Sequence, residues 1–153
     1  MHKPRLKRLQ RLFADHPVYF ITICTRDRKR LLNKNYVHEA FKIFAQEAAS
    51  HGVFVGNYVL MPDHLHLFVA FSSEAMPVSL WIKSLKNSLS KMLRQKEIHA
   101  PHWQKGFFDR VLRSEESYAG KWEYVAGNPL RAGLVKRPED WPLRGEIYVL
   151  SAL

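Results

Sequence analysis

Two histidines separated by one residue are the first candidates for chemistry in this sequence. His64 and His66 follow Met61-Pro-Asp63 in a stretch rich in strand-forming residues. Alternate residues of a strand point to the same face, so we expect both imidazoles to leave the sheet side by side, with Leu65 and Leu67 on the opposite face. Neutral imidazole is a common ligand of divalent metal ions. The pair indicates either a metal site or two half-buried polar residues with local hydrogen-bond partners.

A hairpin is predicted to position the two histidines. Its arms are Val53–Leu60 and His64–Phe71, and Pro62 forces the break between them because it lacks a backbone donor and has a fixed φ. Gly56 marks a β-bulge in the first arm.

Two further strands are predicted from β-rich runs, Val18–Thr25 and Phe107–Leu112. The basic run Arg26–Arg30 follows the first of them and, taken alone, is typical of a solvated turn. Trp103 and Phe107 lie near the second, where they either stack an unpaired base or fill the core, and the core is the better interpretation for each.

Two amphipathic helices are predicted from apolar residues at i, i+3, i+4 and i+7. The first spans Tyr36–Ser50 and ends at His51-Gly52, and the second spans Val78–Arg94. Polar residues recur at helical spacing on one side of the second helix. This side is either a grip for a sugar-phosphate backbone or an ordinary solvated face. Its members are Lys83, Lys86, Asn87, Ser90, Lys91 and Arg94.

A third helix begins after Ser114, a plausible N-cap, and runs towards Gly127. Its apolar stripe is Tyr118, Trp122 and Val125. Tyr124 lies about 240° around the helix from Tyr118, well off that stripe. Asn128 follows Tyr124 by four residues and therefore lies over the same face, although Pro129 places it in the last turn or just past it. The next residues, through Gly133, are turn-rich.

Composition limits the class of protein. At 153 residues we expect one domain spanning 1–153, with a basic arm at 1–12 and a C-terminal tail at 136–153 that packs back on the body. Cys24 is the single cysteine, which excludes an internal disulfide and fits a reducing cytoplasm. We expect no apolar signal segment and no membrane-spanning helix. A formal net charge of +10 indicates a polyanionic partner, with nucleic acid ahead of a membrane surface.

Three motifs in order resemble the REP-associated tyrosine transposases, which belong to the HUH class of single-stranded DNA transposases. The resemblance runs from about residue 19 to residue 135. Its motifs are His64-Leu-His66 after Met-Pro-Asp, Trp103-Gln-Lys-Gly-Phe-Phe-Asp-Arg110, and Tyr124-Val-Ala-Gly-Asn-Pro-Leu-Arg-Ala-Gly-Leu134.

The resemblance implies a ferredoxin-like α+β fold, a central antiparallel sheet with helices packed against it. The element order read from the sequence agrees with that class. The resemblance also implies the residue roles. His64 and His66 match the metal-binding pair, Tyr124 matches the nucleophile, and Asn128 matches the third metal ligand through its side-chain carbonyl.

The implied activity is nicking and rejoining of single-stranded or hairpin DNA through a 5′-phosphotyrosine intermediate. The implied cofactor is a divalent ion, Mg²⁺ or Mn²⁺, which two imidazoles and one amide oxygen do not distinguish. The expected partner is DNA carrying palindromic repeats, bound by a cytoplasmic monomer or homodimer that associates with the bacterial nucleoid. We expect its basic contacts at Lys83, Lys86, Lys91, Arg110 and Arg113.

Three alternatives remain open at the level of sequence. Tyr118 lies near Tyr124 and is a second candidate nucleophile, although the four-residue step from it leads to Trp122 rather than to an amide. A non-catalytic nucleic-acid-binding module on the same fold explains the charge equally well. A metallo-hydrolase of the His-x-His-x-Asp-His type is disfavoured, because the residues after His66 are Leu-Phe-Val.

Overall fold

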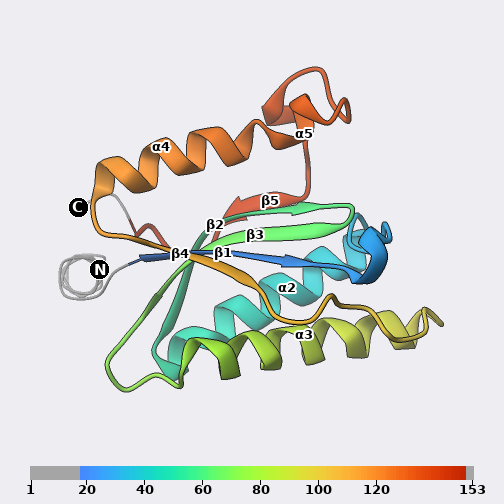
Figure 1. Cartoon of the computed structure of the whole chain (residues 1–153), viewed down its shortest axis with the longest axis horizontal. Coiled ribbons are helices and arrows are strands. Elements are labelled where there is room, and N and C mark those ends of the chain that lie inside the picture. The colour runs from blue at the N-terminus through green and yellow to red at the C-terminus, as the bar shows by residue number, and fades with distance from the viewer. Residues whose placement is uncertain (1–17, 151–153) are drawn as a thin grey trace.

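A five-stranded antiparallel sheet forms the centre of the structure, a computed structural model that describes residues 18–150 (Figure 1). The strand order is β4-β1-β3-β2-β5, and every neighbouring pair is antiparallel. The strands are β1 (Val18–Cys24), β2 (Val53–Met61), β3 (His64–Phe71), β4 (Phe108–Leu112) and β5 (Arg144–Glu146). The predicted basic arm at 1–12 lies outside the described residues.

The β2–β3 hairpin confirms the predicted turn. Met61 pairs with His64, so Pro62 and Asp63 alone form the loop. The register shifts between Val55 and Tyr58, which confirms the bulge predicted at Gly56. A Cβ at Gly56 would lie 2.6 Å from the Tyr118 hydroxyl, so the bulge needs a residue without a side chain.

Helices cover both faces of the sheet (Figure 1). On one face lie α2 (Asn35–Ala48) and α3 (Val78–Gln95), and on the other lies α4 (Glu115–Ala126), followed by the short α5 (Asn128–Arg131). Short 3-10 turns occur at Arg26–Arg28, Ala49–His51 and Pro138–Asp140. Strand, helix, hairpin, helix and strand give the β-α-β-β-α-β order of ferredoxin-like folds, with α4 added, so the predicted α+β class is confirmed.

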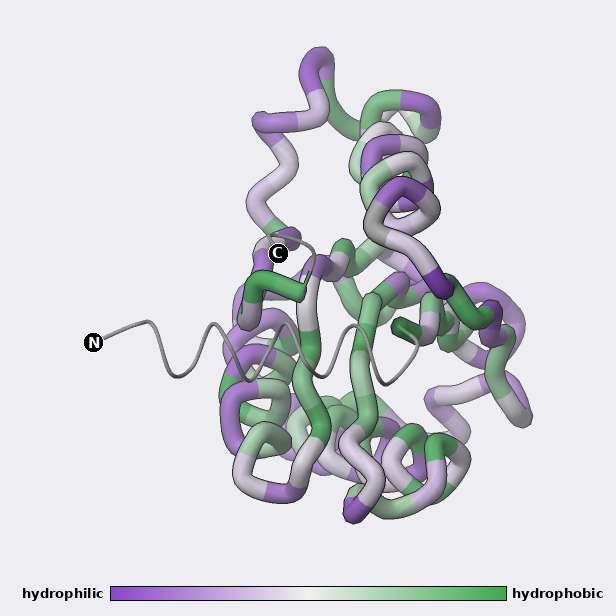
Figure 2. Tube along the Cα trace, turned by 90° about the vertical axis from the view of Figure 1, so that its left-hand side faces the viewer, coloured by the Kyte–Doolittle hydropathy of each residue, from purple (hydrophilic) through white to green (hydrophobic). Residues whose placement is uncertain are grey.

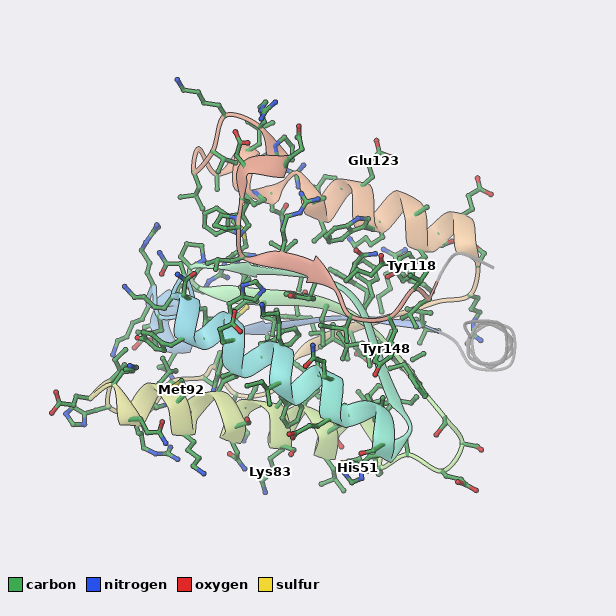
Figure 3. All side chains as sticks on the ribbon, turned by 180° about the vertical axis from the view of Figure 1, so that it is seen from behind. His51, Lys83, Met92, Tyr118, Glu123 and Tyr148 are labelled. Carbon is green, nitrogen blue, oxygen red and sulfur yellow. The ribbon has the colours of Figure 1, made fainter. Side chains whose placement is uncertain are left out.

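The alternation of side chains along β3 divides the core in two. Leu65 and Leu67 belong to the cluster under α2 and α3, as expected, whereas Phe68 belongs to the cluster under α4. Figure 2 shows the strands as largely hydrophobic, with hydrophilic residues along the helices outside them. In Figure 3, Tyr118 points from α4 towards the sheet and Lys83 lies on the outer side of α3. The α4 face is therefore the face that carries His64 and His66.

The structure differs from the sequence-based expectations at three places. β5 was not predicted, and it pairs with β2 along the tail, where Leu150 is fully buried. Residues Asn128–Arg131 form a helical turn rather than an irregular one. Ser90 is 7% exposed instead of lying on a solvated face, because its hydroxyl accepts a hydrogen bond from Trp103 Nε1 at 2.9 Å.

No helix within residues 18–150 combines the length and the hydropathy that crossing a membrane requires.

Candidate functional site

The two histidines of β3 lie side by side on the α4 face of the sheet. Their ring centroids are 4.6 Å apart and the ring planes meet at 76°. Both side chains are partly exposed at the end of the hairpin, next to the Pro62-Asp63 loop. The predicted juxtaposition is therefore present.

A carboxylate fixes the orientation of the His64 ring. His64 Nδ1 lies 2.7 Å from Asp63 Oδ1, and the other carboxylate oxygen of Asp63 pairs with Arg28 Nε at 2.9 Å. Arg28 Nη2 also lies 3.3 Å from the same Nδ1. One nitrogen cannot both donate and accept, and the shorter contact to the carboxylate decides: we assign the proton to Nδ1. His64 Nε2 then carries the free lone pair.

His66 is held by the neighbouring strand. Its Nδ1 lies 2.7 Å from the Thr22 hydroxyl, and its ring stacks on Phe20 with centroids 5.3 Å apart and planes at 24°. In the tautomer in which Nδ1–H donates to Thr22, His66 Nε2 is left as an acceptor. The two histidines therefore share one pattern, with Nδ1 engaged by the protein and Nε2 available.

Burial keeps both imidazoles neutral. Desolvation lowers the pKa of His66 to about 3, helped by the neighbouring His64 ring and by the positive charges of Lys121 and Arg28. Desolvation also lowers the pKa of His64, although Asp63 opposes that shift. A metal ligand must be deprotonated, so neutral rings with free Nε2 atoms fit a divalent cation.

The third ligand of such a cation has to be a different kind of side chain. Among residues 18–150 no three histidine, cysteine, aspartate or glutamate side chains are arranged to hold a metal ion together. The two imidazoles, oriented by Asp63 and Thr22, are therefore an incomplete set of metal ligands, which an amide oxygen would complete.

Tyr124 lies on α4 with most of its side chain exposed to solvent. It is 61% exposed. Lys121 Nζ lies 5.6 Å from its ring centroid and 4.8 Å from that of Phe20, the residue on which His66 stacks. Lys121 therefore links the tyrosine to the histidine face within one chain.

Tyr118 has the opposite environment. It is 1% exposed, and its hydroxyl accepts hydrogen bonds from the Asn57 backbone N–H at 3.1 Å and from Asn57 Nδ2 at 3.0 Å. Burial raises its pKa to about 12. Tyr118 is a core residue, so of the two tyrosines left open by the sequence only Tyr124 is accessible to a substrate.

Asn128 begins α5 and is engaged by Arg131. The Arg131 guanidinium donates to Asn128 Oδ1 and, at 2.5 Å, to the Tyr124 carbonyl, and it lies 4.0 Å from the Tyr124 ring centroid. The expectation that Asn128 and Tyr124 share a face agrees with their common contact. In this arrangement the amide oxygen of Asn128 faces Arg131.

An open groove of about 540 Å³ runs between β4 and α4. It contains Tyr124 together with three cationic side chains, two of which, Arg110 and Arg113, were predicted to contact DNA. Its walls are Arg110, Val111, Leu112, Arg113, Ser117, Gly120, Lys121 and Tyr124.

The three predicted lysines of α3 lie in the helix layer on the other face of the sheet. Lys83 and Lys91 are exposed there. Lys86 is already engaged, because its ammonium donates to the carbonyls of Gln104 at 3.1 Å and Gly106 at 2.6 Å. The structure therefore brings Arg110 and Arg113, but not these lysines, next to Tyr124.

Sequence reasoning missed the residues that support the site. Thr22 faces His66 only through the β1–β3 register, and Arg28 had been interpreted as part of a solvated turn although it pairs with Asp63. Lys121 precedes Tyr124 by three residues, so the two side chains lie on the same face of the helix. This spacing is the sequence feature from which Lys121 could have been predicted to lie beside Tyr124.

Comparison with known proteins adds four findings. Residues 15–120 match the family described as "Transposase IS200 like", and the match ends before Tyr124. A REP-associated tyrosine transposase of Escherichia coli is 23% identical over 137 residues, which cover 87% of this chain and 78% of that protein. A Haemophilus influenzae protein provisionally assigned to the same group is 25% identical over 156 residues, covering 91% and 89% respectively.

A solved structure of a REP-associated tyrosine transposase bound to a REP hairpin has a TM-score of 0.65 and 21% identity to this chain, covering 84% of it and 75% of the other chain. At that identity the likeness shows a common fold.

Proposed function

The chain belongs to the IS200-like transposase family, and from this premise we propose that it nicks and rejoins single-stranded or hairpin DNA through a 5′-phosphotyrosine formed on Tyr124. The proposed substrate is a DNA hairpin with an unpaired flank, because the structural relative is one bound to a REP hairpin. The proposed place of action is the cytoplasm, on the nucleoid when DNA is bound.

The observation that carries the proposal is the position of Tyr124. An exposed phenol shares a groove with Arg110 and Lys121, and Lys121 reaches from that phenol to the ring beneath His66. Cations beside a nucleophile attract an anionic phosphodiester, whose own charge otherwise repels attack.

The proposed step exchanges one phosphate ester for another. The Tyr124 phenol loses its proton and its oxygen bonds to phosphorus, while the bond from phosphorus to the 3′-oxygen breaks. The 3′-oxygen leaves as a hydroxyl after taking up a proton, and the 5′-phosphate stays on the tyrosine. No water is consumed, so a 3′-hydroxyl from another strand can reverse the step and join the ends.

The proposed metal ligands are the Nε2 atoms of His64 and His66 and the side-chain carbonyl of Asn128, with Mg²⁺ or Mn²⁺ as the ion. When bound, a divalent ion supplies charge neutralisation at a phosphoryl oxygen. Asp63 and Thr22 engage the Nδ1 atoms of the two rings, which leaves the Nε2 atoms as the proposed ligand atoms.

In this proposal Arg131 releases Asn128 when DNA binds, because a guanidinium held on the amide oxygen would repel a metal ion at the same atom. A phosphate entering the groove offers the guanidinium a charge-assisted and bidentate partner, which is stronger than its bond to a neutral amide. DNA binding and completion of the site are thereby coupled. The same exchange uncovers the Tyr124 ring, on which Arg131 now lies.

The experiment is a covalent-adduct assay. The full chain is mixed with an end-labelled hairpin carrying unpaired flanks and Mg²⁺ or Mn²⁺, and SDS-resistant complexes are separated by electrophoresis. We expect an adduct that EDTA prevents and that Tyr124→Phe abolishes, with hairpin affinity unchanged. DNA binding without any adduct would contradict the proposal and support a non-catalytic binding module, and an adduct that survives Tyr124→Phe would refute the assignment of the nucleophile.

A further inference from the structure

Phe108 lies in the same cross-strand row as His66. In the antiparallel register Phe108 is opposite Thr22 on β1, and Thr22 is opposite His66 on β3. Residues opposite each other point to the same face of a sheet. Two strand spacings separate Phe108 from His66, which is about 10 Å. An aromatic side chain therefore stands on the proposed catalytic face, at the β4 edge of the sheet.

The core does not account for this side chain. Phe108 is 65% exposed, whereas its neighbour Phe107 packs against the cluster under α2 and α3. A single exposed apolar residue is ordinary in itself. Phe108 differs because it borders a hollow on one side and precedes, by two residues, a wall residue of the Tyr124 groove, Arg110.

The hollow has a volume of about 150 Å³ and is lined by Cys24, Gln104, Lys105, Gly106, Phe107 and Phe108. Cys24 pairs with His64 in the β1–β3 register, so the hollow lies one strand away from the histidine pair. Its volume is well below the roughly 300–1,000 Å³ of sites for drug-sized ligands. It suits one flat ring system rather than a larger molecule.

Hydrogen bonds fix the loop Gln104–Gly106, which forms one wall of the hollow. Lys86 donates to the carbonyls of Gln104 and Gly106, and the Gln104 N–H donates to the Cys24 carbonyl at 2.9 Å. Trp103 Nε1 donates to Ser90 Oγ at 2.9 Å. These bonds tie the loop to α3 and to β1, so the hollow exists before any ligand arrives. Preformed walls reduce the entropy lost on binding.

We propose that Phe108 and this hollow form a subsite for one unpaired nucleobase of the DNA strand that reaches Tyr124. The inference deepens the proposed function and rests on it. The base stacks on the Phe108 ring, and the Gln104 and Gly106 loop borders its edge. Arg110 receives the phosphate on the side of the Tyr124 groove, and Lys105 receives one on the side of the hollow. Every base has a π-face, so an aromatic platform holds an unpaired strand with little dependence on sequence.

The subsite predicts a preference for flanked hairpins. A base paired within a duplex cannot reach a hollow at the edge of the sheet. An unpaired nucleotide beside the hairpin can, and it is then held next to the phosphate to be cut. Phe108 acts in this scheme by positioning the strand and takes no part in the bond changes.

The test compares two hairpins, one with an unpaired flank and one blunt, by fluorescence anisotropy with Phe108→Ala, Phe108→Trp and the control Ile43→Ala. Ile43 is 55% exposed on α2, on the opposite face of the sheet. Ile43→Ala therefore removes an exposed apolar side chain at a place that the proposed DNA does not reach. We expect Phe108→Ala to weaken binding of the flanked hairpin on the order of 10-fold, and to leave the blunt hairpin unchanged. Phe108→Trp retains affinity, and Ile43→Ala changes neither hairpin.

A second readout places the base directly. The nucleotides of the flank are replaced one at a time by 2-aminopurine, whose fluorescence is quenched by stacking. We expect one position to be quenched by the wild-type protein and by Tyr124→Phe, and to recover in Phe108→Ala. No quenched position, or equal losses for both hairpins, would overturn the subsite.

The two proposals fail separately. Quenching that depends on Phe108 without any covalent adduct would retain the subsite and refute the catalytic function. An adduct formed with wild-type affinity by Phe108→Ala would refute the subsite and retain the function.

Discussion

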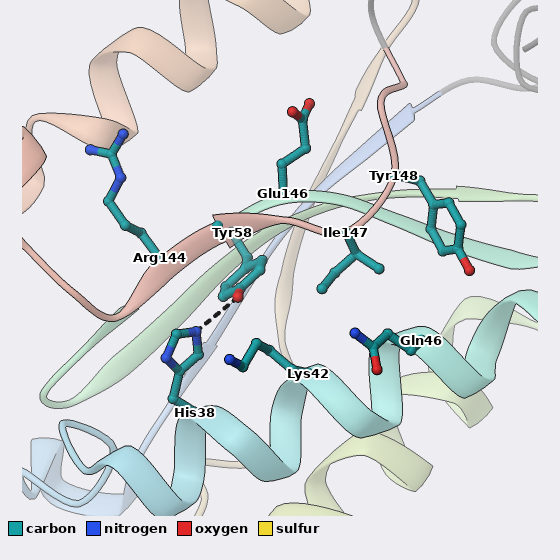
Figure 4. Close-up of a pocket in the computed structure, with 9 residues that line it drawn as sticks. His38, Lys42, Gln46, Tyr58, Arg144, Glu146, Ile147 and Tyr148 are labelled. Atoms are coloured by element: carbon teal, nitrogen blue, oxygen red, sulfur yellow. Dashed lines mark hydrogen bonds between the residues drawn. The ribbon is translucent and has the colours of Figure 1, made fainter. Parts of the chain in front are cut away.

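The structure contains two sets of histidine and tyrosine side chains, one on each face of the same sheet. The first is His38 on α2 and Tyr58 on β2, which are 8% and 1% exposed. Their polar atoms meet, with His38 Nε2 2.8 Å from the Tyr58 hydroxyl (Figure 4). Burial raises the pKa of Tyr58 to about 12 and lowers that of His38. Each satisfies the other, and the pair stabilises the fold.

The second set is His64 and His66 on β3 with Tyr124 on α4. Here the Nδ1 atoms are bound by Asp63 and Thr22, and the phenol stands 61% exposed in a cationic groove. The residue types are the same as in the first set. The difference is that the polar atoms of the second set do not bind one another, so they are available to an ion and to a phosphate.

Residue type and a lowered histidine pKa therefore do not separate a structural set from a candidate catalytic set. What separates them is where the remaining lone pairs and protons point. His66 and His38 both have a lowered pKa, yet His38 is bonded to Tyr58 through Nε2, whereas His66 is bonded to Thr22 through Nδ1. The same substitution made in each of the two sets should therefore have different effects.

The largest effect is expected from the histidines. His66→Ala removes a proposed metal ligand, so metal-dependent adduct formation should fall by more than the roughly 10–100-fold typical for loss of a residue that only supports a ligand. His38→Ala should leave the adduct rate at saturating DNA unchanged. Adduct rates and Mn²⁺ affinity by calorimetry measure both. Equal losses in the two variants would show that the distinction between the sets is wrong.

Substitution of Tyr58 should affect stability, and substitution of Tyr124 should affect activity. Tyr58→Phe leaves His38 Nε2 without its partner inside the protein, so we expect a loss of about 1–3 kcal/mol in the free energy of unfolding with the adduct retained. Tyr124→Phe removes an exposed hydroxyl, so its unfolding free energy should stay within about 0.5 kcal/mol of wild type. Urea denaturation followed by circular dichroism gives both values. Destabilisation by Tyr124→Phe would indicate a structural role for that phenol.

The smallest effect concerns pH. The folded pKa of His38 is lowered, so below the unfolded value near 6.5 the unfolded chain binds more protons than the folded one. Stability should therefore fall as the pH drops below about 6.5, by at most about 1.4 kcal/mol per pH unit for each such histidine. His38→Gln should make this slope shallower while keeping a hydrogen bond to Tyr58. An unchanged slope from pH 7 to pH 5 would show that His38 does not titrate as its burial implies.

The helices with a clear periodicity of hydrophobic residues were predictable from sequence. The repeats of Val37, Phe41 and Ala45 and of Leu85 and Leu89 place the two helices within one or two residues of their observed ends, because those side chains form the core. The three residues of β5 carry no such period. Their pairing depends on the contact with β2, where Gly145 lets the Tyr58 hydroxyl approach to a distance that a Cβ would block.

The candidate site was predictable only in part. The alternation rule places His64 and His66 together, and the helical angle separates Tyr124 from Tyr118. The partners Thr22 and Arg28 come from β1 and the turn after it, and only the register of the sheet brings them to the histidines. Trp103 and Phe107 pack against the core, as the preferred interpretation held, while the exposed aromatic Phe108 was not singled out. Its exposure depends on which strand forms the sheet edge.

The central claim is that the accessible tyrosine, rather than either buried one, receives the DNA. The most direct measurement is to trap the adduct with a hairpin substrate, digest the protein and the DNA, and locate the attached nucleotide by mass spectrometry. The account predicts a single modified peptide with a 5′-phosphate linked to Tyr124. A nucleotide on Tyr118 or Tyr58, or on any residue outside the β4–α4 groove, would contradict it.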